Sequence, residues 1–148
     1  MPQSADDYMK SPLFHDIRVG IYLLEHEYSR EIVLAGFLHD ALEHSEAKED
    51  DIKNLFGQKV LELVKANSKD YSIEDSGKRT EELVSRTAKA GKDAMIIRAA
   101  DTLDSFKHYT ETQDQKNLEY CRKNAEEIFK HLTEADEEEV FKELKVYL

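Results

Sequence analysis

The chain has 148 residues, 40% of them hydrophobic, and 21 basic against 32 acidic side chains give a net charge of −11. This length suits a single domain with its own core, and the acidic balance argues against a broad surface for nucleic acid or anionic membrane. The chain has only two prolines and five glycines, so few residues would break helices, and we expect one all-α domain over residues 1–148. Its single cysteine cannot form an internal disulfide. The absence of a signal pattern or a membrane-length apolar run favours a cytoplasmic protein.

Residues 1–12 are polar and contain both prolines, so we expect an extended lead-in. A helical pattern starts at His15, where Ile17, Ile21 and Leu24 share an apolar face that is widened by Val19, Tyr22 and Leu23. His15 then lies at or just before the start of this helix. Taken alone, His15 is better explained as a surface or capping histidine than as a ligand.

A second helix is predicted over residues 30–44, with Ser29 as its N-cap. It is apolar over most of its circumference, which is typical of a helix at the centre of a domain. His39 and Asp40 interrupt the apolar surface, and Glu43 follows His39 by one turn on the same face. A core histidine bonded to Glu43 or to a backbone carbonyl would explain His39 alone. A divalent cation explains the three residues together better, because buried charges need compensation.

Short helices are predicted over residues 49–56 and 58–65, with Gly57 between them. Residues 67–77 have no apolar period and predict a surface loop, and a weakly amphipathic helix is expected over residues 79–90.

A second strongly apolar helix is predicted to begin at Asp93 as its N-cap. The polar residues that share one face of this helix are Arg98, Asp101, Ser105 and His108. For Asp101, a salt bridge to Arg98 or Lys107 and a role as metal ligand are equally good explanations. Residues 110–148 are predicted to add amphipathic helices that serve packing.

Three of the predicted helices together carry a set of metal-ligand side chains: His15, His39, Asp40 and Asp101. Mixed nitrogen and oxygen donors suit Mn²⁺, Fe²⁺, Co²⁺, Ni²⁺ or Zn²⁺ better than Ca²⁺. Four protein ligands leave room on the metal for water and a substrate oxygen, which indicates metal-assisted hydrolysis of a phosphate ester. Glu43 is placed to orient or deprotonate that water, and Arg98 to hold a phosphate.

This arrangement resembles the HD-domain phosphohydrolases, whose pattern is H…HD…D on a helical bundle. Within them it is most similar to the hydrolase domain of RelA/SpoT-type alarmone enzymes and their small single-domain relatives. The segments that carry the resemblance are Leu13-Phe14-His15, Arg18-Val19-Gly20, residues 34–43, Phe56-Gly57, Val60, Leu63-Val64 and residues 97–101. The resemblance implies an HD-type bundle of about seven to eight helices, Mn²⁺ as the usual metal, and removal of the 3′-pyrophosphate from guanosine penta- or tetraphosphate. It also implies that the partner is a small-molecule nucleotide and neither a nucleic-acid polymer nor a membrane.

The sequence departs from this family at three places. The acidic Glu-Asp pair after the HD doublet is Glu43-His44 here, and the nucleotide-contacting Asn of the family is Ser105. The segment before His15 lacks the usual basic, Gly-containing approach, and Lys10 is its one basic residue. We expect Glu43 and His44 to be catalytic, although a solvent-facing spectator explains His44 equally well. The expected substrate contacts are Arg98, Ser105 and Lys10.

Three functions are therefore compatible with the sequence. An alarmone 3′-pyrophosphohydrolase is favoured, and the first alternative is an HD hydrolase of another nucleotide, for example a phosphomonoesterase. The second alternative is a non-catalytic regulatory protein that binds metal or nucleotide. Glu43 argues against this last reading, because a purely structural metal site has no need of a carboxylate beside an open coordination position. The oligomeric state is left open.

Overall fold

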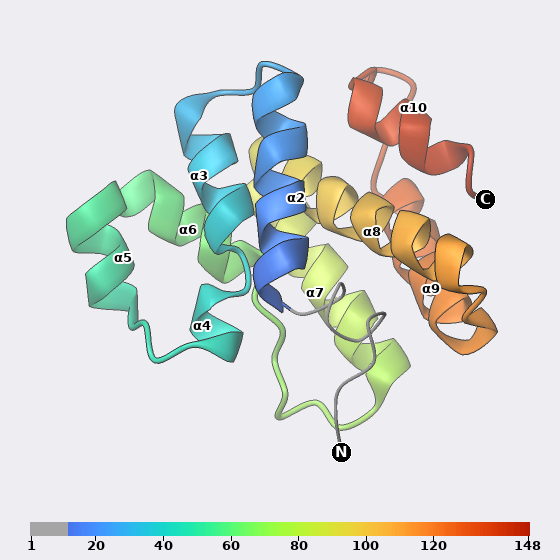
Figure 1. The fold of residues 1–148 in the computed structure, drawn as a ribbon, viewed down its shortest axis with the longest axis horizontal. Helices are drawn as coiled ribbons and strands as arrows, with labels where there is room; N and C mark the ends of the chain where they lie inside the picture. Colours follow the sequence, from blue (N-terminus) through green and yellow to red (C-terminus); the bar gives the residue numbers. More distant parts are fainter. Residues whose placement is uncertain (1–11) are drawn as a thin grey trace.

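A computed structural model describes residues 12–148, which form nine helices and no strand (Figure 1). Their bounds are α2 Pro12–Glu25, α3 Arg30–Leu38, α4 Ala41–His44, α5 Glu49–Phe56, α6 Gln58–Ala66, α7 Ser76–Ala90, α8 Lys92–Thr112, α9 Gln115–Lys130 and α10 Glu139–Lys145. The all-α prediction is confirmed, with one helix more than expected because residues 30–44 form two. Within the described part of the chain, no helix has the length and apolarity needed to cross a membrane.

The bundle is organised around α8, in which every residue from Ala94 to Leu103 is buried. This helix packs against α2, α3, α6, α7, α9 and α10, and Figure 1 shows it passing behind α2 through the middle of the molecule. The apolar pattern predicted residues 30–44 as a helix at the centre of the domain, and α3 packs against α2, α6 and α8, but α8 contacts more of the other helices. The 9-residue α3 is too short to contact as many neighbours as the 21-residue α8.

The first described helix begins at Pro12, three residues before the predicted start. Proline is favoured at the first helical position, because its missing N–H has no partner there and its fixed φ suits the helix. His15 therefore lies inside the first turn of α2. The predictions made for residues 1–11, an extended lead-in and a substrate contact by Lys10, lie outside the described part of the chain.

The inward side of α2 is the part of the predicted apolar face that contains Val19 and Leu23. His15, Val19 and Leu23 recur every four residues and are buried against the bundle. The exposed apolar side chains of α2 are Leu13, Ile17, Ile21 and Leu24. Since both faces carry apolar residues at helical spacing, periodicity alone could not choose between them.

The predicted helix over residues 30–44 breaks at His39 and Asp40. His39 Nδ1–H donates to the carbonyl oxygen of Gly36 at 2.7 Å. In an uninterrupted α-helix that carbonyl would accept from the backbone N–H of Asp40. The imidazole therefore bonds to the carbonyl oxygen that a continued helix would use, at the position where α3 ends.

The remaining boundaries fall close to the predicted ones, with one correction. Helices α5 and α6 match residues 49–56 and 58–65 to within one residue, and α9 and α10 are the expected packing helices. Asp93 is not an N-cap, because α8 starts at Lys92 after Gly91, whose φ of 117° ends α7 in a conformation that favours glycine. Asp93 lies in the first turn of α8 instead and pairs with Lys59 at 3.4 Å.

Helices α2 and α3 approach each other closely at two glycines. A Cβ atom on Gly20 would overlap the Phe37 ring, and one on Gly36 would overlap the Leu23 side chain. The Gly36 Cβ would also lie 3.6 Å from the Cα atom of Gly20, so the two backbones are nearly in contact. The position of His39 relative to His15 depends on this approach.

We predict that Gly20→Ala destabilises the fold, because the new methyl group displaces Phe37 from the α2–α3 contact. The expected loss in the free energy of unfolding is about 1–3 kcal/mol, as for other overpacked cores. Urea unfolding followed by circular dichroism measures it. Gly77→Ala in α7 is the matched control, because its Cβ meets only the Asp75 Oδ1 atom, at 3.3 Å. An equal effect of the two variants would contradict the packing role of Gly20.

Candidate metal centre and its cavity

Side chains from α2, the α3–α4 break and α8 meet in one buried cluster. Ligand atoms of His15, Asp16, His39 and Asp40 all lie within 4.8 Å of one another. Asp101 of α8 joins them, with its Oδ1 atom 2.7 Å from His15 Nε2 and its Oδ2 atom 3.6 Å from His39 Nε2. The structure thus brings together the four predicted ligands and adds Asp16, which the sequence analysis missed.

The His39 imidazole is oriented as a metal ligand would be. Its side chain is fully buried, and Nδ1 donates to the Gly36 carbonyl oxygen, which leaves Nε2, the atom that would bind a metal, directed at the cluster. Nε2 has no hydrogen-bond partner among the described residues. It faces oxygens of Asp40, Asp16 and Asp101 at 3.4, 3.6 and 3.6 Å. A lone pair facing carboxylates is unfavourable without a cation between them, so the residues fit a divalent ion.

The environment keeps Asp40 ionised, as a ligand must be. Burial alone raises the pKa of its carboxyl group, but the charges of His39 and His15 and the contact with the Asp16 carboxyl group outweigh it. The pKa of Asp40 therefore lies well below its usual range.

A second layer of residues holds His15. Its Nδ1 lies 2.7 Å from Asp104 Oδ2, and Arg18 donates to both Asp104 oxygens, from Nε at 2.8 Å and from Nη2 at 3.0 Å. Burial raises the pKa of Asp104, but the hydrogen bonds from His15 and Arg18 lower it to about 2. With Nδ1 donating to Asp104, Nε2 of His15 is left for the cluster. The sequence signal for Asp104 was its spacing of three from Asp101, which puts both on one face of α8.

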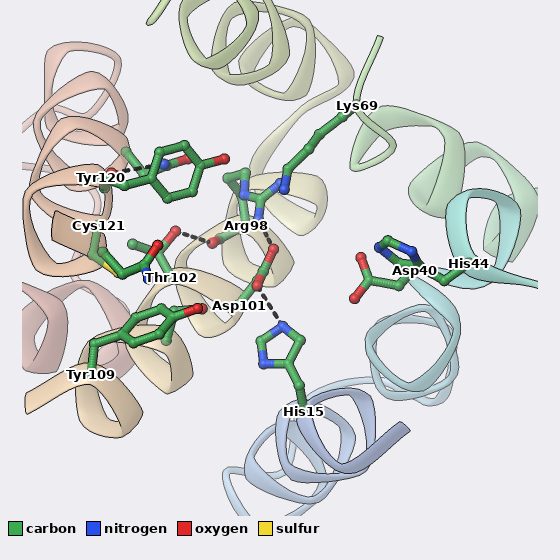
Figure 2. Close-up of a pocket in the computed structure, with 13 residues that line it drawn as sticks. His15, Asp40, His44, Lys69, Arg98, Asp101, Thr102, Tyr109, Tyr120 and Cys121 are labelled. Atoms are coloured by element: carbon green, nitrogen blue, oxygen red, sulfur yellow. Dashed lines mark hydrogen bonds and ion pairs between the residues drawn. The ribbon is translucent and has the colours of Figure 1, made fainter. Parts of the chain in front are cut away.

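A cavity of about 240 Å³ opens on the cluster between α8, α9 and the α3–α4 break (Figure 2). Its wall is formed by His15, Asp40, His44, Lys69, Arg98, Asp101, Thr102, Ser105, Tyr109, Asn117, Tyr120, Cys121 and Asn124. The metal-ligand side chains occupy one end, and two tyrosines and two amides occupy the other. A ligand that fills this cavity contacts both ends.

Arg98 lies at the junction of the two ends and is 3% exposed. One guanidinium nitrogen pairs with Asp101, which is one of the two explanations considered for that aspartate. Within residues 12–148, its Nε and Nη1 atoms are buried without a hydrogen-bond partner. Burial lowers the pKa of Arg98, while Tyr120, Asp40 and Glu43 act in the opposite direction. Buried donors without a partner are costly, so an anion in the cavity would satisfy them.

Lys69 reaches the same cavity from the segment between α6 and α7, which the sequence predicted as a loop. Its ammonium nitrogen lies 5.7 Å from the centre of the Tyr120 ring. Burial raises the pKa of Tyr120, but Lys69 and Arg98 lower it below the ordinary value. Two cations and an acidified phenol therefore share one wall of the cavity, although the chain as a whole is strongly acidic.

Of the other predicted site residues, two line the cavity and one of the described residues does not. His44 and Ser105 line the cavity, whereas Glu43 lies outside its wall, with its Oε1 atom buried and without a hydrogen-bond partner in the described structure. Lys10 lies outside the described residues.

An all-α bundle in which histidines and aspartates of three segments converge on one point is a candidate divalent-metal hydrolase scaffold. A family model described as "HD domain" matches residues 1–138. The chain therefore belongs to the HD domain family.

Two of the curated relatives are named for the same activity. The chain is 26% identical over 117 residues to a guanosine-3′,5′-bis(diphosphate) 3′-pyrophosphohydrolase of Aquifex aeolicus, covering 77% of this chain and 17% of the relative. It is 32% identical over 76 residues to the pyrophosphohydrolase MESH1 of Drosophila melanogaster, covering 51% and 42%. The chain thus spans less than half the length of these relatives.

Two solved structures share the fold. The protein lmo0812 of Listeria monocytogenes superposes with a TM-score of 0.76 at 20% identity, covering 90% of both chains. A metazoan ortholog of SpoT, described as hydrolysing ppGpp, gives a TM-score of 0.74 at 23% identity and covers 91% of this chain and 78% of its own. At these identities the likeness supports the fold alone.

We predict that Asp104→Asn weakens binding of Mn²⁺ by about 10–100-fold, the usual cost of losing a partner that orients a ligand. Isothermal titration calorimetry measures the dissociation constant. Glu127→Gln is the matched control, because it neutralises a buried carboxylate of α9 that Lys123 and Lys130 hold at 3.2 and 2.6 Å. Unchanged Mn²⁺ affinity in Asp104→Asn would rule out this role of Asp104.

Proposed function

We propose that this chain removes the 3′-pyrophosphate of guanosine 3′,5′-bis(diphosphate) in a reaction that depends on a divalent ion. The residues that would hold the ion are His15, His39, Asp40 and Asp101. The observation that carries the proposal is that this cluster and the unpartnered N–H groups of Arg98 face one cavity. The names of the Aquifex and Drosophila relatives support the choice of substrate.

A bound divalent ion lowers the pKa of water and neutralises charge on phosphate oxygens. Two imidazoles and two carboxylates suit Mn²⁺ best, and Fe²⁺, Co²⁺, Ni²⁺ and Zn²⁺ are also compatible with this donor set.

Arg98 and Lys69 bind the anionic part of the substrate. Arg98 donates its buried N–H groups to a phosphate oxygen and offsets the charge that develops at phosphorus. Lys69 brings a second positive charge to the same wall. Because the pair Arg98–Asp101 links the phosphate to the cluster, the scissile phosphate is held next to the metal-ligand residues.

Proton transfer is assigned to the residues that follow the HD doublet. Although Glu43 lies outside the cavity wall, its buried Oε1 atom has no hydrogen-bond partner in the described structure, and we assign it to accept a proton from the attacking water. His44, which lines the cavity, donates a proton to the leaving oxygen. The hydroxyl group of Ser105 contacts the nucleoside. Lys10 is assigned to the substrate on the family resemblance alone.

A small nucleotide is the proposed partner, and neither a polymer nor a membrane is required. The single Cys121 is buried in α9, which suits a reducing compartment, and we place the protein in the cytoplasm.

A hydrolase of another nucleotide is the second candidate. It is favoured by the two cavity residues that differ from the family pattern, His44 in place of Asp and Ser105 in place of Asn. These changes leave the metal-ligand cluster intact and alter the part of the wall that would contact the substrate.

We predict that the protein with Mn²⁺ converts guanosine 3′,5′-bis(diphosphate) and water to guanosine 5′-diphosphate and pyrophosphate, and that EDTA abolishes the reaction. Chromatography of the products measures it, with Asp101→Ala as the inactive control. Release of orthophosphate from nucleoside monophosphates, without pyrophosphate from the alarmone, would favour the second candidate. Turnover of neither class would contradict both.

We predict that Glu43→Gln preserves Mn²⁺ affinity and lowers kcat by about 10²–10⁴-fold, because it removes the proton acceptor and leaves the ligands in place. Calorimetry and a turnover assay on the same preparation separate the two effects. Full activity in Glu43→Gln would remove Glu43 from the reaction and leave His44 as the acid/base residue of the cavity.

A further inference from the structure

The cluster contains more carboxylates than the H…HD…D pattern supplies. We propose that Asp16 is a fifth protein ligand to the divalent ion, so that the chain binds the ion through two His-Asp doublets, His15-Asp16 and His39-Asp40, together with Asp101. The inference rests on the proposed function only in assuming that a divalent ion occupies the cluster.

Asp16 lies about as close to His39 as the two predicted carboxylate ligands do. Its Oδ1 atom lies 3.6 Å from His39 Nε2, the same distance as Asp101 Oδ2 and close to the 3.4 Å of Asp40 Oδ2. Asp16 also belongs to the group of four residues whose ligand atoms lie within 4.8 Å of one another. Donor atoms of one ion lie within about twice a metal–ligand bond of each other, roughly 4–4.5 Å for bonds of 2.0–2.2 Å, and the 3.6 Å between Asp16 Oδ1 and His39 Nε2 meets this limit.

The acidic residues alone would not define a site, but His39 points to a ligand among them. Its Nε2 atom is fully buried, faces all three carboxylates, and has no hydrogen-bond partner in the part of the chain that the structure describes. An ion bound at this nitrogen would lie near three carboxylates, each of which has an oxygen 3.4–3.6 Å from His39 Nε2. A cation positioned for Asp40 and Asp101 therefore also attracts Asp16.

The charge of the cluster supports the same assignment. The side chains of Asp16, Asp40 and Asp101 are only 15%, 16% and 13% exposed, so their mutual repulsion is weakly screened. Arg98 pairs with Asp101, and the nearby Arg18 is bound to Asp104. Imidazoles that bind a metal are neutral, so in the metal-bound cluster the three carboxylates carry three negative charges, against one positive charge from Arg98. A divalent ion brings this sum to zero.

A fifth ligand has a consequence for the choice of metal. Three carboxylates and two imidazoles form a predominantly hard donor set that suits a six-coordinate ion such as Mn²⁺ or Fe²⁺ better than tetrahedral Zn²⁺. Five protein donors leave a six-coordinate ion one position for an exogenous oxygen, where four donors leave two. Asp16 would thus select the metal and restrict what else the ion can bind.

The test uses Mn²⁺ alone, without nucleotide, and compares the full chain with Asp16→Asn. Calorimetry should show a dissociation constant at least about tenfold higher in Asp16→Asn, because losing a direct ligand costs no less than losing an outer partner. Thermal unfolding supplies the second readout. A ligand role predicts that the metal-free variant melts no lower than the metal-free wild type, since a repelling charge is removed, and that Mn²⁺ raises its melting temperature less.

Glu25→Gln is the matched control, because it removes one exposed carboxylate from the other end of α2 and should change neither readout. A dissociation constant raised less than tenfold in Asp16→Asn would overturn the inference. A metal-free variant that melts lower than the metal-free wild type would also overturn it, by indicating a structural role. A wild-type chain that binds no Mn²⁺ would overturn both this inference and the proposed function. Failure to hydrolyse the alarmone alone would leave the inference intact.

Discussion

The fold is constrained by the convergence of three carboxylates on one imidazole nitrogen. His39 Nε2 lies 3.4–3.6 Å from oxygens of Asp16, Asp40 and Asp101, which belong to α2, the α3–α4 break and α8. Such a cluster costs free energy in an apolar bundle unless a cation compensates it. The three segments can reach one point only because α2 and α3 touch at Gly20 and Gly36 and because α8 passes behind both. The geometry of the site therefore depends on the close packing of α2 and α3.

The site also decides which residues of α2 are buried. His15 must face the cluster, and Val19 and Leu23 share its face and enter the core. The opposite choice would bury Ile17 and Ile21 and turn His15 toward solvent. Keeping His15 inward therefore leaves the apolar side chains on the other side of α2 exposed. A sequence pattern that counts only apolar residues cannot show which side is buried. The helix also breaks at His39, where the imidazole bonds to the Gly36 carbonyl oxygen.

Local chemistry made most of the fold predictable. Ser29 caps α3 as expected, with its side chain accepting from Ile32 N–H, and Gly57 separates α5 from α6. The residues His15, His39, Asp40 and Asp101 could be proposed together because their types and order matched a known pattern. Asp16 could not, and Asp104 offered only its helical spacing from Asp101, because the partners of both residues lie on other helices. Spacing along the chain can also mislead. Glu43 follows His39 by one helical turn, but it does not line the cavity.

The cations of the cavity show how a chain of net charge −11 can accommodate a polyanion. Lys69 follows the end of α6, where carbonyl groups would lack partners. Arg86 of α7 donates to the carbonyl oxygens of Lys65 at 2.6 Å and Ser68 at 2.7 Å, and Thr87 donates to that of Ala66 at 2.7 Å. These bonds tie the start of the segment to α7, so the backbone that carries Lys69 is fixed before any ligand binds. Arg98 is fixed in turn by burial in α8 and by its pair with Asp101. Local positive charge in the cavity therefore depends on two anchored residues, and the acidic remainder of the surface would repel anions that cannot reach them.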